Sequence, residues 1–278
     1  MDRAPAGTAR PVRKPGRFAG SSVYWSWYAP RNFGDWITPY LFGKLSGRAP
    51  QHRRPDRLAP GERVLFGAGS ILRHLQRPGV AVVWGSGVIA ATDRFAAPLR
   101  THAVRGPLTR ARMRALGYPC PAVYGDPGLL LPRVHRPRHG TRFRLGLIPH
   151  FAELAAVAAR PLPDGWVLID VTRPVEEVAD AIAACDRTVS SSLHGIVVSH
   201  AYGVPCARIA ADVPLHGDGT KFLDHYAALG RPAPRPARWE DVTPHGLRAL
   251  DFVAEDVGAL QDRLLAACPF LADGQPTP

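Results

Sequence analysis

Residues 187–209 read RTVSSSLHGIVVSHAYGVPCARI, and their pattern indicates the fold class of the chain. Residues 187–189 are a short β-favouring run, residues 195–202 have the apolar pattern of a buried helix, and residues 206–209 are apolar again. A strand, a helix and a further strand in succession are typical of a parallel sheet flanked by helices. The stretch therefore predicts an α/β fold.

The same alternation of short apolar runs and longer helical patterns extends over the whole chain. Further strands are predicted at residues 23–27, 63–66, 80–84, 102–104, 122–124, 144–148 and 166–170. Further helices are predicted at residues 35–45, 107–116, 176–184, 221–229 and 247–267. We expect two mostly parallel sheets with helices packed on them.

A segment dense in proline and arginine, LPRVHRPRHGT at residues 131–141, is typical of a linker. The chain has 278 residues, and at about 150 residues per domain two domains are expected. We predict a disordered basic tail at residues 1–20, a Rossmann-like domain at residues 21–135, and a second one at residues 136–278 that includes the C-terminal helix. Two such domains would face each other across a central cleft at the carboxyl ends of their strands.

The composition excludes several classes of protein. The chain is 46% apolar and 21% charged, as in a globular protein, and it has no run of the roughly 18 apolar residues that a membrane-spanning helix needs. Its four cysteines are far apart, so neither a disulfide framework nor a zinc site is expected. Such thiols fit the reducing cytoplasm, and residues 1–20 lack the apolar segment of a secretory signal.

Positive charge is concentrated in the first half of the chain. Residues 1–141 carry 23 basic and 6 acidic side chains, whereas residues 142–278 carry 12 and 17. The excess favours an anionic partner, such as a phosphorylated small molecule, an acidic membrane surface or a nucleic acid. Only three of the 35 basic residues are lysines, which equally favours a compositional bias toward arginine. We expect the first half to line one wall of the cleft, with peripheral contact at the inner membrane face as a further expectation.

Three glycine-containing turns follow predicted strands in the first half: FGAGS with Ser70, WGSG with Ser86, and YGDPG with Asp126. Glycine permits a tight turn and a close approach of a ligand to the backbone. None of the turns completes G-x-G-x-x-G or a P-loop, so neither of these nucleotide sites is expected. Their shared position makes Ser70, Ser86 and Asp126 candidates for the rim of the cleft.

Two further motifs place polar side chains beside predicted helix starts. NFGD at residues 32–35 contains Asn32 and Asp35, and Asp35 suits the N-cap position while the free amide groups suit an anion. Arg105 ends a predicted strand just before the helix that begins at Pro107, where its guanidinium group offers a fork for phosphate or carboxylate.

The most specific signal is SSSLHG at residues 190–195. The hydroxyl groups of Ser191 and Ser192 and the amide groups of a helix that starts at Gly195 suit an oxyanion, and His194 can move a proton near neutral pH. No G-x-S-x-G motif is present, so a serine hydrolase is not indicated. Lys221 opens a later helix, where a cation opposes the helix dipole, and this favours an anion-binding role.

In their order along the chain, these motifs resemble the polysaccharide pyruvyl transferase family. The resemblance extends from about residue 22 to about residue 230. It rests on NFGD (32–35), GAG (67–69), WGSG (84–87), VRGP (104–107), GDP (125–127), SSLHG (191–195) and KF (221–222).

The resemblance implies two Rossmann-like halves arranged as in GT-B glycosyltransferases. It also implies transfer of the pyruvate group of phosphoenolpyruvate onto two hydroxyls of a sugar, in a polysaccharide or its lipid-linked precursor. The product would be a cyclic ketal, with phosphate released. The Arg, His and Lys that the family associates with phosphoenolpyruvate map to Arg105, His194 and Lys221.

We accordingly predict His194 as catalytic, with no cofactor beyond the donor substrate and no metal ion, because no D-x-D-like motif is evident. The predicted donor-binding residues are Arg105, Lys221, Ser191, Ser192 and Gly195. The predicted cleft or acceptor residues are Asn32, Asp35, Ser70, Ser86 and Asp126.

Two other classes stay open. A GT-B-type glycosyltransferase would use the same cleft and His194 but would bind a nucleotide sugar instead of phosphoenolpyruvate. A nucleic-acid binder would rely on the basic half and would show steep salt dependence. That half has no aromatic side chains clustered between its cations and no known binding motif, so specific nucleic-acid binding is not expected.

Overall fold

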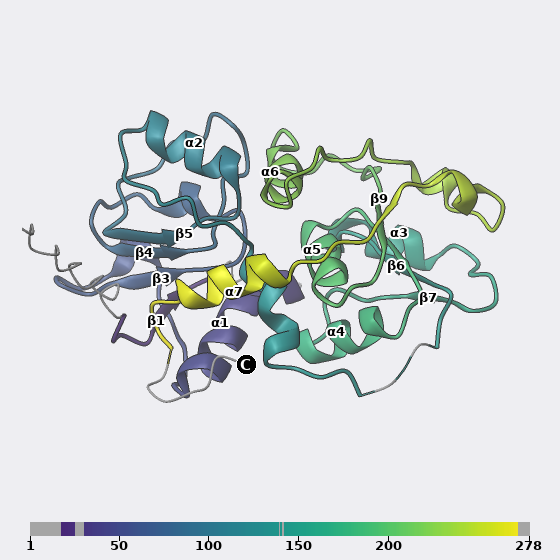
Figure 1. The fold of residues 1–278 in the computed structure, drawn as a ribbon, viewed down its shortest axis with the longest axis horizontal. Coiled ribbons are helices and arrows are strands. Elements are labelled where there is room, and N and C mark those ends of the chain that lie inside the picture. Colours follow the sequence, from purple (N-terminus) through teal and green to yellow (C-terminus); the bar gives the residue numbers. More distant parts are fainter. Residues whose placement is uncertain (1–17, 26–30, 139, 141, 272–278) are drawn as a thin grey trace, which may run out of the picture.

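The computed structural model describes residues 18–25, 31–138, 140 and 142–271. Most of the predicted tail at residues 1–20 therefore lies outside the described residues. The described chain forms two separate β-sheets with helices packed around them (Figure 1). The predicted α/β class is confirmed.

The first sheet is parallel throughout, with the strand order β2-β1-β3-β4-β5. Its strands are β1 (Ser22–Tyr24), β2 (Gln51–His52), β3 (Val64–Phe66), β4 (Ala81–Trp84) and β5 (Arg100–Ala103). Its helical segments are α1 (Phe33–Ser46), η1 (Pro55–Arg57), η2 (Leu72–His74) and α2 (Pro107–Ala115). Strands β3 and β4 are buried along their whole length, as is usual for parallel strands that are covered on both faces.

The second sheet has the order β10-β9-β8-β6-β7, and only β10 runs antiparallel to its neighbour. Its strands are β6 (Leu145–Ile148), β7 (Trp166–Leu168), β8 (Thr188–Ser190), β9 (Cys206–Arg208) and β10 (Phe252–Val253). Its helices are α3 (Leu154–Ala158), α4 (Val175–Ala183), α5 (Leu193–Ala201), α6 (Thr220–Ala228) and α7 (Gly258–Ala266). Short 3-10 turns lie at η4 (Phe151–Glu153), η5 (Trp239–Asp241) and η6 (Gly246–Ala249).

Most predicted elements lie within a few residues of the observed ones, and two predictions were wrong. The strand at residues 122–124 is reduced to a single bridge between Val104 and Tyr124. The long helix at residues 247–267 is divided into η6, β10 and α7. Its middle instead pairs with the exposed edge of β9, and α7 begins anew at Gly258, whose amide donates to Asp256 Oδ1 at 2.9 Å.

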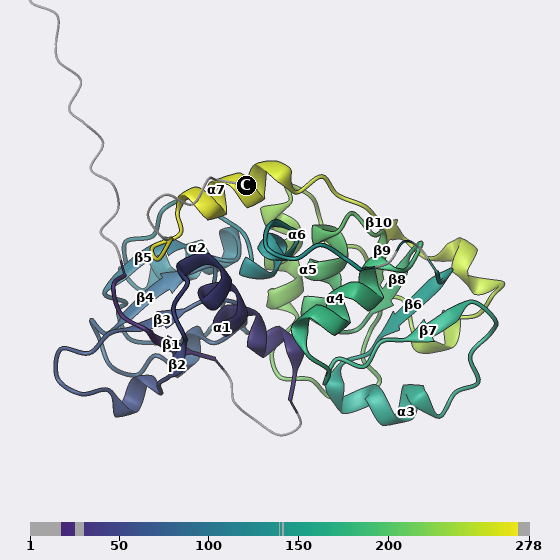
Figure 2. The same cartoon turned by 90° about the horizontal axis from the view of Figure 1, so that it is seen from below.

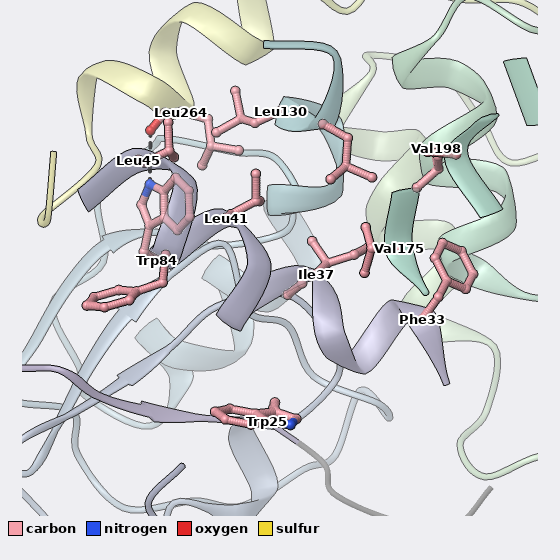
Figure 3. Close-up of a cluster of buried hydrophobic side chains, with 14 of the residues drawn as sticks. Trp25, Phe33, Ile37, Leu41, Leu45, Trp84, Leu130, Val175, Val198 and Leu264 are labelled. Carbon is pink, nitrogen blue, oxygen red and sulfur yellow. Dashed lines mark hydrogen bonds between the residues drawn. The ribbon is translucent and has the colours of Figure 1, made fainter. Parts of the chain in front are cut away.

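The predicted linker at residues 131–141 begins inside a buried segment. Residues Pro127–Arg133 form a 3-10 helix, η3, whose leucines 129–131 have no exposed surface. Leu130 and Leu131 join a hydrophobic core that contains Phe33 and Ile37 of α1, Val175 of α4 and Val198 of α5 (Figure 3). Because the core draws on both halves of the chain, apolar burial holds the two sheets in one arrangement.

The C-terminal helix α7 packs on the first half, although we assigned it to the second. It lies along the outside of the molecule beside α1 and the first sheet (Figure 2). The indole Nε1 of Trp84 donates to Leu264 O at 2.9 Å, and the Phe270 ring contacts both Trp84 and Phe42. The chain therefore returns to its first half after completing its second sheet.

Candidate active site

A cavity of about 540 Å³ is lined by residues from both halves. It collects the predicted residues Asn32, Asp35, Ser70, Ser192, His194 and Lys221. Their positions in sequence span almost 190 residues, so the site exists only when both sheets have formed. The predicted residues Arg105, Ser86, Asp126, Ser191 and Gly195 do not line the cavity.

The strand orders explain why the cavity lies where it does. In the first sheet β1 is flanked by β2 and β3, and in the second β6 is flanked by β7 and β8. The direction in which successive strands are added to the sheet therefore reverses beside β1 and beside β6. Open α/β sheets bind ligands at such switch points, outside the carboxyl ends of the strands. Asn32 follows β1 and Ser70 follows β3, while His150 follows β6 and Ser192 follows β8. The cavity therefore uses the switch points of both sheets at once.

Three helices begin at this cavity. Asn32 is the N-cap of α1 and accepts a hydrogen bond from Gly34 N at 3.1 Å, so the prediction that Asp35 caps the helix was wrong. Ser192 precedes α5 and Gly219 precedes α6, and neither makes a side-chain cap bond. The first amide groups of α1 are already bonded, Phe33 N to Val171 O and Gly34 N to Asn32, and at the start of α6 Thr220 N donates to Asp218 Oδ1. At these two helices the partial positive charge of the helix start, and not a set of free amide groups, favours an anion in the cavity.

His194 lies directly against the start of α1. A Cβ atom at Gly34 would lie 2.1 Å from its Nδ1, so only glycine permits this approach. On the other side, Nε2 lies 3.6 Å from Oδ2 of the fully buried Asp126. The ring is therefore held between two elements, with a carboxylate beside one nitrogen and α1 beside the other.

The two carboxyl groups near His194 have different protonation behaviour. Burial alone would raise the pKa of Asp126, but attraction to His194 and a hydrogen bond from Gly128 N outweigh it, so this pKa lies below its usual value. For Asp35, burial raises the pKa to about 6 although His194 opposes the shift. An ionised carboxylate and a carboxyl group that titrates near neutrality beside one imidazole suit proton transfer.

Lys221 supplies a cation at the cavity wall. Burial, together with the charges of Arg105 and Arg208, lowers the pKa of Lys221 to about 8. Its ammonium group forms no ion pair with a carboxylate in the part of the chain that the structure describes. Because a half-buried cation without a counter-ion is costly, an anionic ligand would stabilise it.

Arg105 lies behind the cavity wall and not in it. Its side chain has no exposed surface, and its Nε lies 3.1 Å from Oδ2 of Asp224 in α6. Nη1 donates to Ser70 Oγ at 2.7 Å, so Arg105 reaches the cavity through Ser70. As expected, Arg105 faces the second half, but its charge is offset by Asp224 and it does not line the cavity.

The other predicted residues are buried in the structure that surrounds the cavity and do not line it. Ser86 is buried and donates to Gly69 O. Ser191 is buried, donates to Glu153 Oε2 at 2.6 Å and accepts from His150 N, so its hydroxyl is engaged away from the cavity. A Cβ at Gly195 would lie 2.3 Å from Ser190 Oγ, so this glycine allows α5 to approach β8.

Several cavity residues were missed by sequence reasoning. Arg73, His74, His150 and His216 line the cavity and were not predicted. His150 could have been found, because it follows β6 just as Ser70 follows β3. Burial and the nearby Lys221 lower the pKa of His150 to about 4, so its ring is neutral at pH 7.

No group of three or more His, Cys, Asp or Glu side chains in the described ranges has an arrangement that could hold a metal ion. The helices in those ranges are also too short or too polar for any of them to traverse a lipid bilayer.

Fold and cavity together define an α/β protein with a cavity between its two halves, lined by Lys221 and by a histidine held between Asp126 and the start of α1. Residues 63–212 match the family model for polysaccharide pyruvyl transferase, and the chain belongs to this family. A region of 159 residues is 30% identical to "Uncharacterized protein L143" of Acanthamoeba polyphaga mimivirus. The match covers 54% of this chain and 55% of the viral protein, so the chain spans about half the length of that relative. No solved structure matches the chain.

Proposed function

We propose that the chain transfers the pyruvate group of phosphoenolpyruvate onto two hydroxyls of a sugar in a polysaccharide or its precursor. The products are a cyclic pyruvate ketal and phosphate. The observation that carries the proposal is the cavity itself, which combines three helix starts, Lys221 and the His194 proton-transfer group in a member of the pyruvyl transferase family.

The charges of the cavity suit this donor. Phosphoenolpyruvate carries a phosphate and a carboxylate, and the cavity offers Lys221, the exposed Arg73 and the positive ends of α5 and α6. Arg105, paired with Asp224 behind the wall, orients the Ser70 hydroxyl through its Nη1. Charge-assisted hydrogen bonds to such groups are among the strongest that a protein makes.

The first step adds one hydroxyl to the donor. The imidazolium of His194 gives a proton to the methylene carbon of phosphoenolpyruvate, while a sugar hydroxyl oxygen forms a bond to the adjacent carbon. The hydroxyl proton goes to the carboxylate of Asp35. Asp126, ionised beside Nε2, stabilises the positive charge of the ring before the transfer.

The second step releases phosphate. The bond between the central carbon and the phosphate oxygen breaks, and the phosphate leaves with the bonding electrons towards Lys221 and the helix starts. The second hydroxyl oxygen bonds to the same carbon and its proton returns to His194. Asp35 gives up its proton to the departing phosphate, which restores both groups.

The proposal extends to the architecture and the compartment. Each sheet has a doubly wound order, 2-1-3-4 counted from β1 or from β6, which supports two Rossmann-like halves in a GT-B-like arrangement. All four cysteines are free thiols, which supports a reducing compartment such as the cytoplasm.

Thermal unfolding with a panel of ligands tests the proposal directly. Phosphoenolpyruvate should raise the melting temperature more than inorganic phosphate does, and a nucleotide sugar should not, because a ligand stabilises the folded state only if it binds there. Sugar acceptors are then screened with phosphoenolpyruvate for phosphate release and for a ketal-bearing product by mass spectrometry. Stabilisation by nucleotide sugars and not by phosphoenolpyruvate would favour a glycosyltransferase instead.

A further inference from the structure

A carboxylate from the second half is buried inside the first half. Asp224 belongs to α6 and has no exposed surface. Its Oδ1 accepts hydrogen bonds from Leu108 N at 2.8 Å and Thr109 N at 3.1 Å. Its Oδ2 accepts from Thr109 Oγ1 at 2.6 Å and from Arg105 Nε at 3.1 Å. All four groups that donate hydrogen bonds to this carboxylate belong to the first half, across the interface between the halves.

Asp224 thereby provides the N-terminal cap that α2 lacks. The residue at the N-cap of α2 is Gly106, which has no side chain to accept a bond from the free amides. A Cβ there would lie 2.0 Å from Asp224 O, so glycine also makes room for α6. The two helices lie side by side (Figure 1), and a carboxylate at this end of α2 is stabilised by the helix dipole.

The contacts form a closed ring of hydrogen bonds. Arg105 donates to Asp224 and to Val88 O, and Val88 N donates to Thr109 Oγ1 at 3.1 Å, which in turn donates to Asp224. Glycine at position 87 is required, because a Cβ would lie 2.3 Å from Cζ of Arg105. A fully satisfied buried network of this kind fixes the relative position of the elements that it joins.

This closed ring of hydrogen bonds is connected to the cavity through α6. Lys221 lies three residues before Asp224 on the same helix, and residues at this spacing share one helix face. The start of α6 has a second attachment, because Asp218 Oδ2 accepts from Ala91 N at 3.1 Å in the first half. The position of the Lys221 ammonium group therefore depends on how α6 is held against α2.

We propose that Asp224 is a positioning residue that joins α6 to the start of α2 and thereby holds Lys221 in the anion cavity. The coupling is reciprocal, because a ligand that fixes Lys221 must also tighten the bonds from Asp224 to α2. The inference concerns anion binding and goes beyond the proposed pyruvyl transfer. It is therefore tested with inorganic phosphate as the probe.

Hydrogen–deuterium exchange of the full chain, measured with and without phosphate, reads out this coupling. In the wild-type protein, phosphate should slow exchange at residues 106–116, which lie outside the cavity, as well as at residues 217–226. In Asp224→Asn the protection of residues 106–116 should disappear, and phosphate should bind about tenfold more weakly or worse, as expected for a lost charge-assisted contact. Asp262→Asn is the matched control, since Asp262 forms an exposed ion pair with Arg133 and should behave as wild type.

Variants at Thr109 keep the test decisive if Asp224→Asn does not fold. Thr109→Val removes one donor to Asp224 and should weaken the phosphate-dependent protection, whereas Thr109→Ser keeps the hydroxyl and should restore it. Unchanged phosphate affinity and unchanged protection in folded Asp224→Asn, or in Thr109→Val, would overturn the proposal, as would wild-type protein that binds phosphate without protecting residues 106–116. A protein that shows the coupling but transfers no pyruvate would refute only the proposed function.

Discussion

Replacing Asp35 by Asn should lower activity and raise stability at the same time. Burial raises the pKa of Asp35 from 3.8 to about 6, so the folded state holds this proton more tightly than the unfolded state does. Stability therefore falls as the pH rises from about 4 to about 6, and above pH 6 the full penalty persists. A shift of about 2 pKa units corresponds to about 3 kcal/mol, and Asn removes the buried charge.

Two measurements on the same variant check this expectation. At pH 7.5, Asp35→Asn should unfold at a temperature several degrees higher, since each kcal/mol shifts the midpoint by about 2–4 °C in a chain of this size. Its kcat should fall about 10²–10⁴-fold, the usual contribution of a positioned acid–base group. The wild-type rate should rise as the pH passes through about 6, because the Asp35 carboxylate then forms. This rise should be absent from the pH–rate profile of the variant.

Glu177→Gln is the control, because Glu177 also lies in the first turn of a helix but is exposed and paired with Arg173. It should change neither the rate nor the midpoint appreciably. If Asp35 only stabilised the start of α1, Asp35→Asn would lower the midpoint and leave kcat near that of wild type. Either result would refute the role that we assign to Asp35.

Three further outcomes are expected. His194→Gln should lose about 10²–10⁴-fold in kcat with a smaller change in donor KM, and a normal kcat with a raised KM would show that His194 only anchors the donor. Lys221→Ala should raise the KM for phosphoenolpyruvate about tenfold to a hundredfold, and unchanged KM and turnover would mean that the assignment is wrong. Burial lowers the pKa of His200 from 6.5 to about 4, so the folded state resists protonation and stability should fall by about 3 kcal/mol between pH 7 and pH 4. Acid titration of His200→Asn should show a shallower loss than that of the exposed control His245→Asn, and equal slopes would contradict this.

Local pattern and turn chemistry were enough to predict most of the elements and six of the residues that line the cavity. Short β-favouring runs that end in Gly or Ser placed Ser70 and Ser192 at strand ends, and parallel sheets bring such ends to one side. The SSSLHG signal predicted both the start of α5 and the position of His194. The lining residues that were predicted lie near strand ends or helix starts, whereas the missed residues Arg73 and His216 lie in segments that no motif singled out.

The predictions that failed depended on contacts between segments that are distant in the sequence. The pattern at residues 247–267 was helical, but the free edge of β9 recruited Phe252 and Val253 into a strand. Proline and arginine at residues 131–141 indicated a linker, yet Leu131 is needed to fill the shared core. Local sequence patterns do not predict this strand pairing or this burial, because both depend on surfaces formed by distant parts of the chain.

Arg105 shows that the position of a residue after a strand is not enough to predict its role. Its place after β5 predicted a cleft position, but no local pattern indicates that its partner is Asp224, 119 residues later. The prediction that the basic first half lines one wall of the cleft was also wrong in its extent. Arg73 is the arginine that the first half contributes to the cavity lining, so most of the excess charge lies elsewhere on that half.

The shared core around α1, η3, α4 and α5 has a consequence for how substrates enter. A hinge motion that opened the interface would expose Phe33, Ile37 and the leucines of η3 to water, and each such side chain costs about 1.5–3 kcal/mol to expose. Rotation of one half against the other is therefore too costly to occur in each turnover. The cavity is also lined by two segments outside the sheets, residues 150–152 and 214–216, which could move while the shared core stays buried. We therefore expect substrate exchange to depend on local motions of such segments, which take nanoseconds to microseconds in loops, and not on the slower closing of hinged domains.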